Sequence, residues 1–320
     1  GGILGKKIEI IWRDSQSRVD VTKQNVAELI EMENVNMVFG GSASSVAIAA
    51  GEVCREKGVI FFGTLTYSTA TTGIKAHRYL FRECYNAWMG AKAMAAYLKS
   101  QFPVEKNKYF YITADYTWGH TTESSMRYFS QSGNTFRHKG IKTPFPGATE
   151  TDFRKAISFA KIIKPDVLVL VLFGKDMTSA IRIATAEGLK KKMQIVVPNL
   201  TLGMAEGGGP KVMEGVLGAL PWTWRLPYKY NYTKGIEFIE KFSGKYNRYP
   251  STPGASAYTI LYQYKAAVER ANTFKTPAVI KQLEDHKFVS LKDEQLWRGF
   301  DHQNIQTVYA VTTVQNKLIS

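Results

Sequence analysis

The sequence predicts an α/β fold with mostly parallel sheets in two packed domains, and three observations support this class. The chain has 320 residues, of which 44% are apolar and 22% charged, enough for two hydrophobic cores. Its first two thirds alternate short β-rich runs with longer amphipathic segments, as in βα units. Residues 166–173 read DVLVLVLF, a continuous apolar run typical of a strand that helices cover on both faces.

The elements follow from this alternation. Val26 and Leu29 share one face of a first helix, which Asp20 is positioned to cap, and Val46 and Ala50 share one face of the next. A domain crossover is expected near residue 221, where prolines cluster. The predicted strands are 7–12, 37–39, 59–63, 79–82, 108–113, 166–173 and 194–198, and the later helices are 87–98, 122–129, 152–163, 178–188, 238–246 and 255–271.

Composition excludes several classes of protein. The 42 Lys and Arg against 27 Asp and Glu give a formal charge of +15, but these residues are dispersed and no zinc-finger or RNA-recognition motif accompanies them. A solvated basic surface is therefore favoured over nucleic-acid binding. No apolar run reaches the roughly 18 residues of a membrane span. Cys54 and Cys84 permit one disulfide, and they exclude a disulfide-dense scaffold or a four-thiolate zinc site.

Motifs for catalysis are missing from the sequence. The glycine-rich run at 207–211 lacks the spacing of a phosphate loop, and Pro210 removes a backbone donor from it. The five histidines are far apart, and no nucleophile elbow follows a strand. We therefore expect no enzyme activity, no cofactor and no metal site.

Hydroxyl and aromatic side chains instead follow the predicted strands. Residues 40–45 (GGSASS), 64–69 (TLTYST) and 115–119 (DYTWG) each come directly after a strand. The carboxyl ends of parallel strands are where open α/β sheets bind ligands. Ser44 lies where a helix begins, so it is either a ligand contact or simply the helix N-cap.

The order of several motifs resembles one family of binding proteins. GGILGKKIEIIWRDSQS, FGGSASSVAIAA, VIFFGTLTYS, LFRECYNAWMGAKAMAAYL, ITADYTWG, TDFRKAISFAKIIKPDVLVLVLFG and ATAEGLKKK together resemble the type I periplasmic solute-binding proteins of the branched-chain amino acid (Leu/Ile/Val-binding) class, over residues 1 to about 310. The resemblance implies two lobes, each a mostly parallel sheet flanked by helices, with a ligand cleft between them. It places residues 1–85 and 222–303 in lobe 1, and residues 86–221 and 304–320 in lobe 2.

The resemblance also implies ligand-binding residues in the first lobe. Ser44 and Ser45 match the serine pair that binds a ligand carboxylate, and Thr66 and Tyr67 match the second loop of contacts. Tyr258 also matches a ligand-binding position of the family, but a tyrosine buried in the core is an equally good interpretation of this residue.

The second lobe is expected to supply the rest of the site. Trp118 matches the aromatic residue that closes over the ligand, and Phe173 lies in the loop that forms another wall of the ligand site. The expected ligand is a small organic carboxylate, an amide or an amino-acid-like molecule. Asn199 stands where amino-acid-binding members carry an acidic residue for the ammonium group, which favours a carboxylic acid or neutral amide; Asp176, Glu206 or another acidic residue in the cleft is the alternative that restores amino-acid binding.

The implied function is the extracytoplasmic component of an ABC importer, with a small-molecule ligand and a permease as partners. The family's first strand and Leu-Ser-Gly-type loop precede GGILG, so the first lobe is predicted to lack about one βα unit. A lipid anchor on the missing N-terminus is compatible with this expectation. Any export signal is expected to have been removed or never to have been present. The alternatives are a ligand-sensing receptor or regulator of the same fold, and an α/β enzyme with an unrecognised acid or base.

Overall fold

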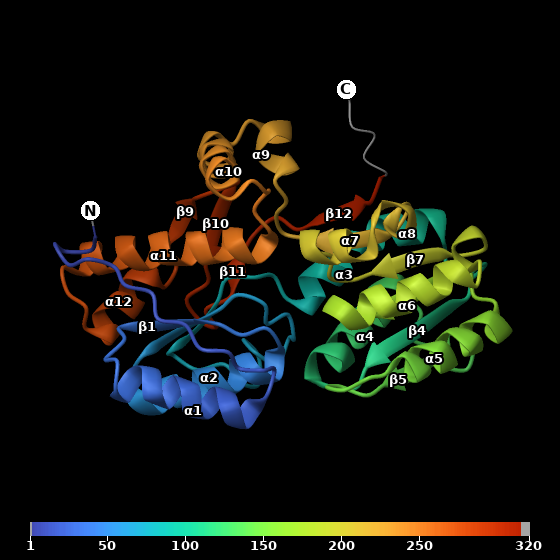
Figure 1. The fold of residues 1–320 in the computed structure, drawn as a ribbon, viewed down its shortest axis with the longest axis horizontal. Coiled ribbons are helices and arrows are strands. Elements are labelled where there is room, and N and C mark those ends of the chain that lie inside the picture. The colour runs from blue at the N-terminus through green and yellow to red at the C-terminus, as the bar shows by residue number, and fades with distance from the viewer. Residues whose placement is uncertain (1, 315–320) are drawn as a thin grey trace. The chain divides into compact units, whose positions relative to one another are not determined.

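The computed structural model describes residues 2–314, which form two compact units (Figure 1). Unit 1 comprises Gly1–Tyr85 and Trp222–Thr307, and unit 2 comprises Asn86–Pro221 and Val308–Ser320. The chain therefore passes between the units three times. The sequence placed the last boundary at 303/304, but β11 (Asn304–Ile305) pairs with β10 (Glu294–Trp297) of unit 1, so this unit extends to Thr307.

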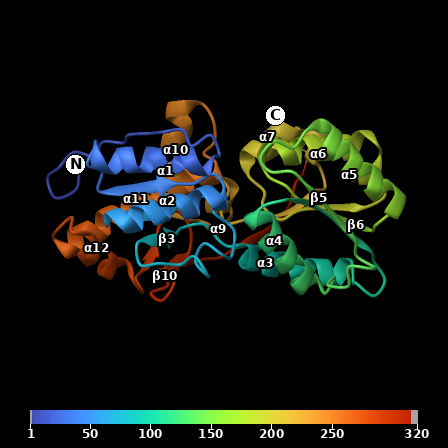
Figure 2. The ribbon, with the colours of Figure 1, turned by 90° about the horizontal axis from the view of Figure 1, so that it is seen from below.

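Unit 2 is built on one six-stranded sheet in the order β12-β8-β7-β6-β4-β5. All neighbours are parallel except β12 and β8, which are antiparallel. Helices α5, α6 and α7 cover one face, and α3 and α4 cover the other (Figure 2). The strands are β4 (Tyr109–Ala114), β5 (Gly140–Thr143), β6 (Val167–Val171), β7 (Gln194–Val197), β8 (Leu217–Leu220) and β12 (Tyr309–Thr312). The helices are α3 (Ala87–Gln101), α4 (Thr117–Ser130), α5 (Glu150–Ile163), α6 (Gly174–Ala186), the 3-10 turn η1 (Leu189–Lys191), α7 (Leu202–Gly208) and α8 (Pro210–Met213).

Unit 1 contains two three-stranded sheets. The parallel sheet has the order β1-β2-β3, and the antiparallel sheet has the order β11-β10-β9. Phe61 of β2 packs with α1 and α2, whereas its neighbour Phe62 packs with α11 and α12, because successive strand residues point to opposite faces. The remaining elements are β1 (Met37–Gly40), β2 (Ile60–Gly63), β3 (Leu80–Arg82), β9 (Lys287–Val289), α1 (Val19–Glu31), α2 (Ser44–Lys57), α9 (Arg225–Tyr230), α10 (Thr233–Tyr246), α11 (Thr252–Ala271) and α12 (Thr276–Leu283).

Three local predictions need correction. Residues 7–12 are not a strand, because within the described chain they have no neighbour with which to form a ladder. Asp20 does not cap α1, which has Arg18 at its N-cap, and lies instead in the first turn. Ser44 is not an N-cap either, since Ala43 occupies that position and Ser44 is the first helical residue of α2.

Two further expectations concern membranes and thiols. Among the described helices, none has the length and apolar character to cross a bilayer. Cys54 and Cys84 are both buried free thiols, so the permitted disulfide is not formed. Burial raises the pKa of each thiol to about 12.

Candidate functional site

In unit 1, the predicted site residues gather at the carboxyl edge of the β1-β2-β3 sheet. The turn from β1 into α2 is tight: Gly41 has φ +88°, and a Cβ there would lie 2.6 Å from the Cβ of Ala47. Only glycine meets both conditions without strain. This turn places Ser44 and Ser45 in the first turn of α2, directly after the strand.

The two serines have different surroundings. The Ser44 side chain is buried, and its Oγ accepts a hydrogen bond of 3.1 Å from the Ser68 backbone N–H, which ties the loop after β2 to α2. Ser45 is half-buried, and its hydroxyl has no hydrogen-bond partner among the described residues. The first turn of α2 carries no acidic side chain. Free N–H groups at a helix N-terminus favour an anion, so Ser45 and this turn can hold a carboxylate.

Thr66 and Tyr67 lie in the loop after β2, but their side chains contact other residues of unit 1. The Thr66 hydroxyl shares a hydrogen bond of 2.6 Å with the Thr71 hydroxyl, and Thr66 is fully buried. The ring of Tyr67 packs against that of Tyr85, with centroids 4.9 Å apart. A role of Thr66 and Tyr67 in ligand contact stays a prediction.

Arg82 positions this loop, and sequence reasoning missed it. Its fully buried guanidinium donates to the Thr66 carbonyl at 3.0 Å and to the Ser68 carbonyl, and it also donates to Thr72 Oγ1 and, at 2.6 Å, to Gln303 Oε1. Burial lowers the pKa of Arg82 to about 10. A lone arginine at the end of an apolar strand was the available signal, because a buried charge needs several partners.

Glu83 is a second residue that sequence reasoning missed. It is buried directly after β3, and the Ser256 hydroxyl donates to its carboxylate. Burial raises the pKa of Glu83, and it lowers the pKa of the nearby Lys292 to about 8. The Lys292 ammonium donates to Gln306 Oε1 at 2.9 Å and to the Thr307 carbonyl at 2.7 Å. These hydrogen bonds join Glu83 to α11 and Lys292 to residues 306–307. Glu83 and Thr307 each lie close in sequence to a point where the chain passes between the units.

Tyr258 lies in a different environment. It is half-buried on α11 and belongs to an aromatic cluster, with ring centroids 4.7 Å from Phe238 and 4.4 Å from Tyr262. The structure therefore places Tyr258 in the packing between α10 and α11. Its assignment to the ligand site stays a prediction.

In unit 2, the predicted residues follow β4, β6 and β7, whose carboxyl ends share one edge of the sheet. Trp118, in the first turn of α4, is buried and contacts Phe173 edge-on, with centroids 6.2 Å apart. Asn199 follows β7 and is buried.

Two aromatic residues that the sequence did not single out complete this edge. The Tyr116 ring stacks on Phe145 at 3.8 Å and lies 5.8 Å from the Trp118 ring. The position of Tyr116 directly after β4 was the available signal.

The acidic groups near this edge are Asp176, Glu206 and Asp115, an exposed residue directly after β4 that pairs with His120 and Lys142. Asp176 in the first turn of α6 is partly buried, and burial raises its pKa. Glu206 on α7 is exposed. Within the described residues, no cluster of three His, Cys, Asp or Glu side chains can hold a metal ion. Besides the partly buried Asp176, the edge offers aromatic rings and the neutral amide of Asn199.

A family model described as "Periplasmic binding protein" matches residues 1–317. No curated protein matches the chain at a significant level. Solved structures match as well, and the three reported next have 17–21% identity, which shows the fold and confirms the two-lobed α/β class.

Three of these structures are the following. A periplasmic binding protein from Burkholderia mallei has 20% identity and a TM-score of 0.87, over 98% of this chain and 80% of its own. An amino acid ABC transporter substrate-binding protein from Pseudomonas fluorescens has 21% identity and a TM-score of 0.86, over 97% and 81%. An ABC transporter solute-binding protein from Rhodopseudomonas palustris, in complex with 3,4-dihydroxybenzoic acid, has 17% identity and a TM-score of 0.85, over 97% and 83%.

Proposed function

Because the chain belongs to the periplasmic binding protein family, we propose that it is the extracytoplasmic solute-binding component of an ABC importer. In this role it captures a small organic carboxylate or amide and delivers it, chemically unchanged, to a permease. Two of the compared structures are ABC transporter binding proteins, which supports this assignment.

The observation that carries the proposal is the turn between β1 and α2. Ser45 presents an uncommitted hydroxyl beside the free N–H groups of a helix N-terminus without acidic residues. A carboxylate bound there gains charge-assisted hydrogen bonds and a favourable interaction with the helix dipole. Ser44 and Arg82 act indirectly, since they fix the neighbouring loop after β2.

The residues of unit 2 favour an apolar or aromatic ligand body. Tyr116 and Phe173 are partly buried rings next to the buried Trp118, and Asn199 is neutral. A ligand ammonium buried against an amide in place of a carboxylate would lack its charge partner. We therefore propose that the ligand is a carboxylic acid or amide without an α-ammonium group.

Calorimetric titration tests this proposal with matched pairs of ligands. Leucine and valine are compared with their deaminated carboxylates, and 3,4-dihydroxybenzoate serves as the aromatic acid. The deaminated acids and the aromatic acid are expected to bind more tightly than the amino acids. Tighter binding of leucine or valine would contradict the ligand assignment.

Variants of the turn and of Asn199 sharpen the test. Ser45→Ala is expected to weaken carboxylate binding about tenfold, since one hydrogen bond to a charged group contributes about 1.5 kcal/mol. Ser42→Ala, an exposed serine of the same turn, is the control and should leave affinity unchanged. Asn199→Asp should move the preference toward leucine, because it supplies the missing negative charge. Equal effects of the two serine variants would remove the turn from the site.

A further inference from the structure

Aromatic and basic side chains are concentrated in one segment of unit 1. Residues 222–250 contain nine aromatic residues, and six Lys and Arg against two Glu. Within this segment α9 and α10 lie side by side, above α11 in Figure 1. We call the exposed side chains of residues 225–249 the α9–α10 surface. Four tyrosines of this surface are 44–52% exposed, namely Tyr228, Tyr230, Tyr246 and Tyr249.

Ring contacts join the two helices of this surface. The Trp224 ring, directly before α9, stacks on that of Tyr249, which follows α10, with centroids 4.0 Å apart and planes 6° apart. Tyr228 lies one turn after Trp224, on the same side of α9. At the end of α10, the Tyr246 ring packs on Phe242 with centroids 4.7 Å apart. The start of α9 and the segment after α10 therefore lie together, with their rings partly in solvent.

Three basic side chains of this surface have no carboxylate partner within residues 2–314. They are Lys229, Lys245 and Arg248, and all three are exposed. The two lysines lie over tyrosine rings instead. The Lys229 Nζ is 5.4 Å from the centroid of Tyr230, and the Lys245 Nζ is 5.1 Å from that of Tyr246. Cationic and aromatic groups are thus interleaved on the α9–α10 surface.

Acidic residues do not neutralise this surface. Glu237 pairs with Lys241 on α10, with their oxygen and nitrogen atoms 3.8 Å apart, and Glu240 is the other Glu of residues 225–249. Cationic side chains therefore outnumber carboxylates across α9, α10 and the residues that follow. An excess of positive charge on one surface is complementary to an anionic partner.

The mixture of tyrosine and lysine favours an anionic lipid surface as that partner. A tyrosine ring is apolar at one end and polar at its hydroxyl, which is why Tyr and Trp gather where proteins meet lipid headgroups. A lysine or arginine near an anionic bilayer is attracted to the phosphates. A soluble anion would pair with the cations but would leave the four tyrosine rings in water. A bilayer accommodates the rings and the cations at the same depth.

We propose that the α9–α10 surface binds the headgroup region of an anionic phospholipid bilayer. Its four tyrosine rings lie at the headgroup level, and its basic side chains pair with lipid phosphates. The contact is peripheral, since no described helix can cross a bilayer. This inference goes beyond the proposed capture of a solute, because it concerns where the protein is held and no solute takes part.

Vesicle sedimentation tests the proposal on the full chain. One set of vesicles contains equal parts of phosphatidylglycerol and phosphatidylcholine, and the control set contains phosphatidylcholine alone. The partition coefficient is expected to be about tenfold or more higher for the anionic vesicles, and to fall as salt is added. Equal partitioning into both sets, or into neither, would overturn the proposal.

Paired lysine variants locate the contact. Lys229→Gln combined with Lys245→Gln should lower the partition coefficient about 25-fold, because each lysine near an anionic surface contributes about 1 kcal/mol. The matched control combines Lys92→Gln with Lys99→Gln, two exposed lysines of α3 in unit 2. Both variants lose the same net charge. Equal losses of binding would show that net charge, and not the α9–α10 surface, attracts the vesicles.

A pair of tyrosine variants examines the contribution of the rings. Tyr246→Ser should weaken partitioning about fivefold, because the part of the ring that enters the bilayer contributes about 1 kcal/mol. Tyr97→Ser, at a ring on α3 that is 40% exposed, is the control and should leave partitioning unchanged. Both rings are largely in solvent, so both variants should fold. No effect of Tyr246→Ser would reduce the contact to charge alone and contradict insertion of the rings.

Polyglutamate separates a lipid surface from an acidic segment of another protein. The parent chain is expected to partition into anionic vesicles more strongly than it binds polyglutamate in solution. Binding of polyglutamate without partitioning into vesicles would overturn the proposal and assign the surface to an acidic polypeptide. All these measurements are made without solute, so a failure of vesicle binding and a failure of the proposed solute-binding function are separate results.

Discussion

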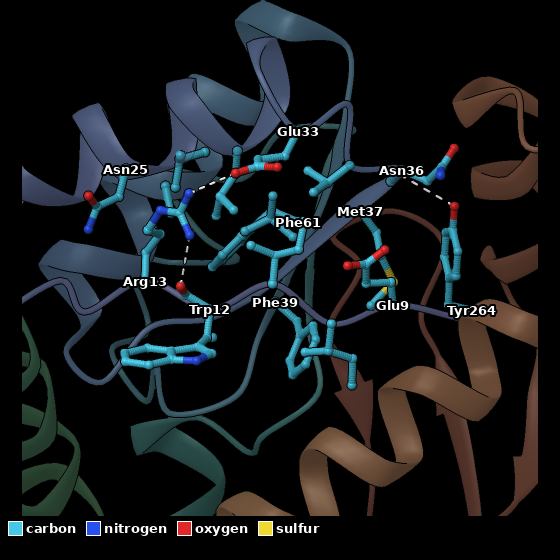
Figure 3. Close-up of a pocket in the computed structure, with 18 of the residues that line it drawn as sticks. Glu9, Trp12, Arg13, Asn25, Glu33, Asn36, Met37, Phe39, Phe61 and Tyr264 are labelled. Atoms are coloured by element: carbon cyan, nitrogen blue, oxygen red, sulfur yellow. Dashed lines mark hydrogen bonds and ion pairs between the residues drawn. The ribbon is translucent and has the colours of Figure 1, made fainter. Parts of the chain in front are cut away.

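β6 of unit 2 and β1 of unit 1 have similar apolar sequences but very different surroundings. Every residue of β6 is 0% exposed, because β4 and β7 flank it and helices cover both faces of the sheet. In β1, Val38 is 9% exposed and Met37 and Phe39 are only partly buried, because among the described residues β1 is the outer strand of its sheet and lines a cavity (Figure 3). An apolar run predicts a strand, but its neighbours decide how much apolar surface that strand buries.

The two units also differ in what holds them together. In unit 2, Phe110, Leu168 and other alternate strand residues join an apolar cluster with α5, α6 and α7 on one face of the sheet, whereas Tyr109 and Val169 are buried outside that cluster. Unit 1 likewise has separate apolar clusters on the two faces of its parallel sheet, and it adds the hydrogen-bond network of Arg82. Unit 1 thus combines its apolar clusters with a buried, hydrogen-bonded guanidinium.

Replacing one phenylalanine in each sheet should give the largest difference in stability between the two units. Phe110→Ala removes a side chain that is 2% exposed in the core of unit 2, and it should lower the free energy of unfolding by about 3–5 kcal/mol. Phe39→Ala should cost about 1 kcal/mol, since that ring is only partly buried. Urea titration followed by hydrogen-exchange mass spectrometry resolves the two units. Equal losses would contradict the contrast between the sheets.

Removing the buried guanidinium of unit 1 should have a somewhat smaller effect. Arg82→Met leaves the Thr66 and Ser68 carbonyls without their donor, and a loss of about 3 kcal/mol is expected. Arg78→Met, at an exposed arginine close by in sequence, is the matched control and should change stability by less than about 0.5 kcal/mol. Labelling of the buried Cys54 and Cys84 thiols measures the opening of unit 1 directly. An unchanged labelling rate in Arg82→Met would refute the structural role of the network.

Acidification should produce the smallest loss of stability, again in unit 1. Burial, with the nearby charge of Arg55, lowers the pKa of His77 from 6.5 to about 4. Between these values the unfolded chain binds more protons than the folded chain, so stability is greatest above pH 6.5 and falls as the pH drops toward 4. For this partly exposed ring, the loss between pH 7 and 5 should be about 1 kcal/mol.

His77→Gln provides the control for this pH dependence. The variant should lose less stability than the parent protein over the same range, as measured by urea unfolding at each pH. An identical pH profile in both proteins would exclude His77 as the titrating group.

The sequence by itself determined the alternation of elements, since period and continuity of apolar residues are local properties. The run DVLVLVLF identified β6, and the positions of GGSASS and DYTWG placed Ser45 and Trp118 directly after strands. Parallel strands bring such loops to one edge of a sheet, so much of each unit's candidate edge was predictable. The sequence also indicated that a neutral residue, Asn199, stands where amino-acid-binding members of the family carry an acidic one.

Tertiary structure alone decided which of these groups are available. Ser44 and Thr66 are the same hydroxyl types as Ser45, but their bonds to Ser68 and Thr71 come from loops that only folding brings together. Residues 7–12 have a strand's sequence and are not one, because a ladder needs a neighbour as well as a pattern. Arg82 likewise gains its acceptors from distant segments. Pairing and hydrogen bonding are non-local, so no pattern of residues along the chain could reveal them.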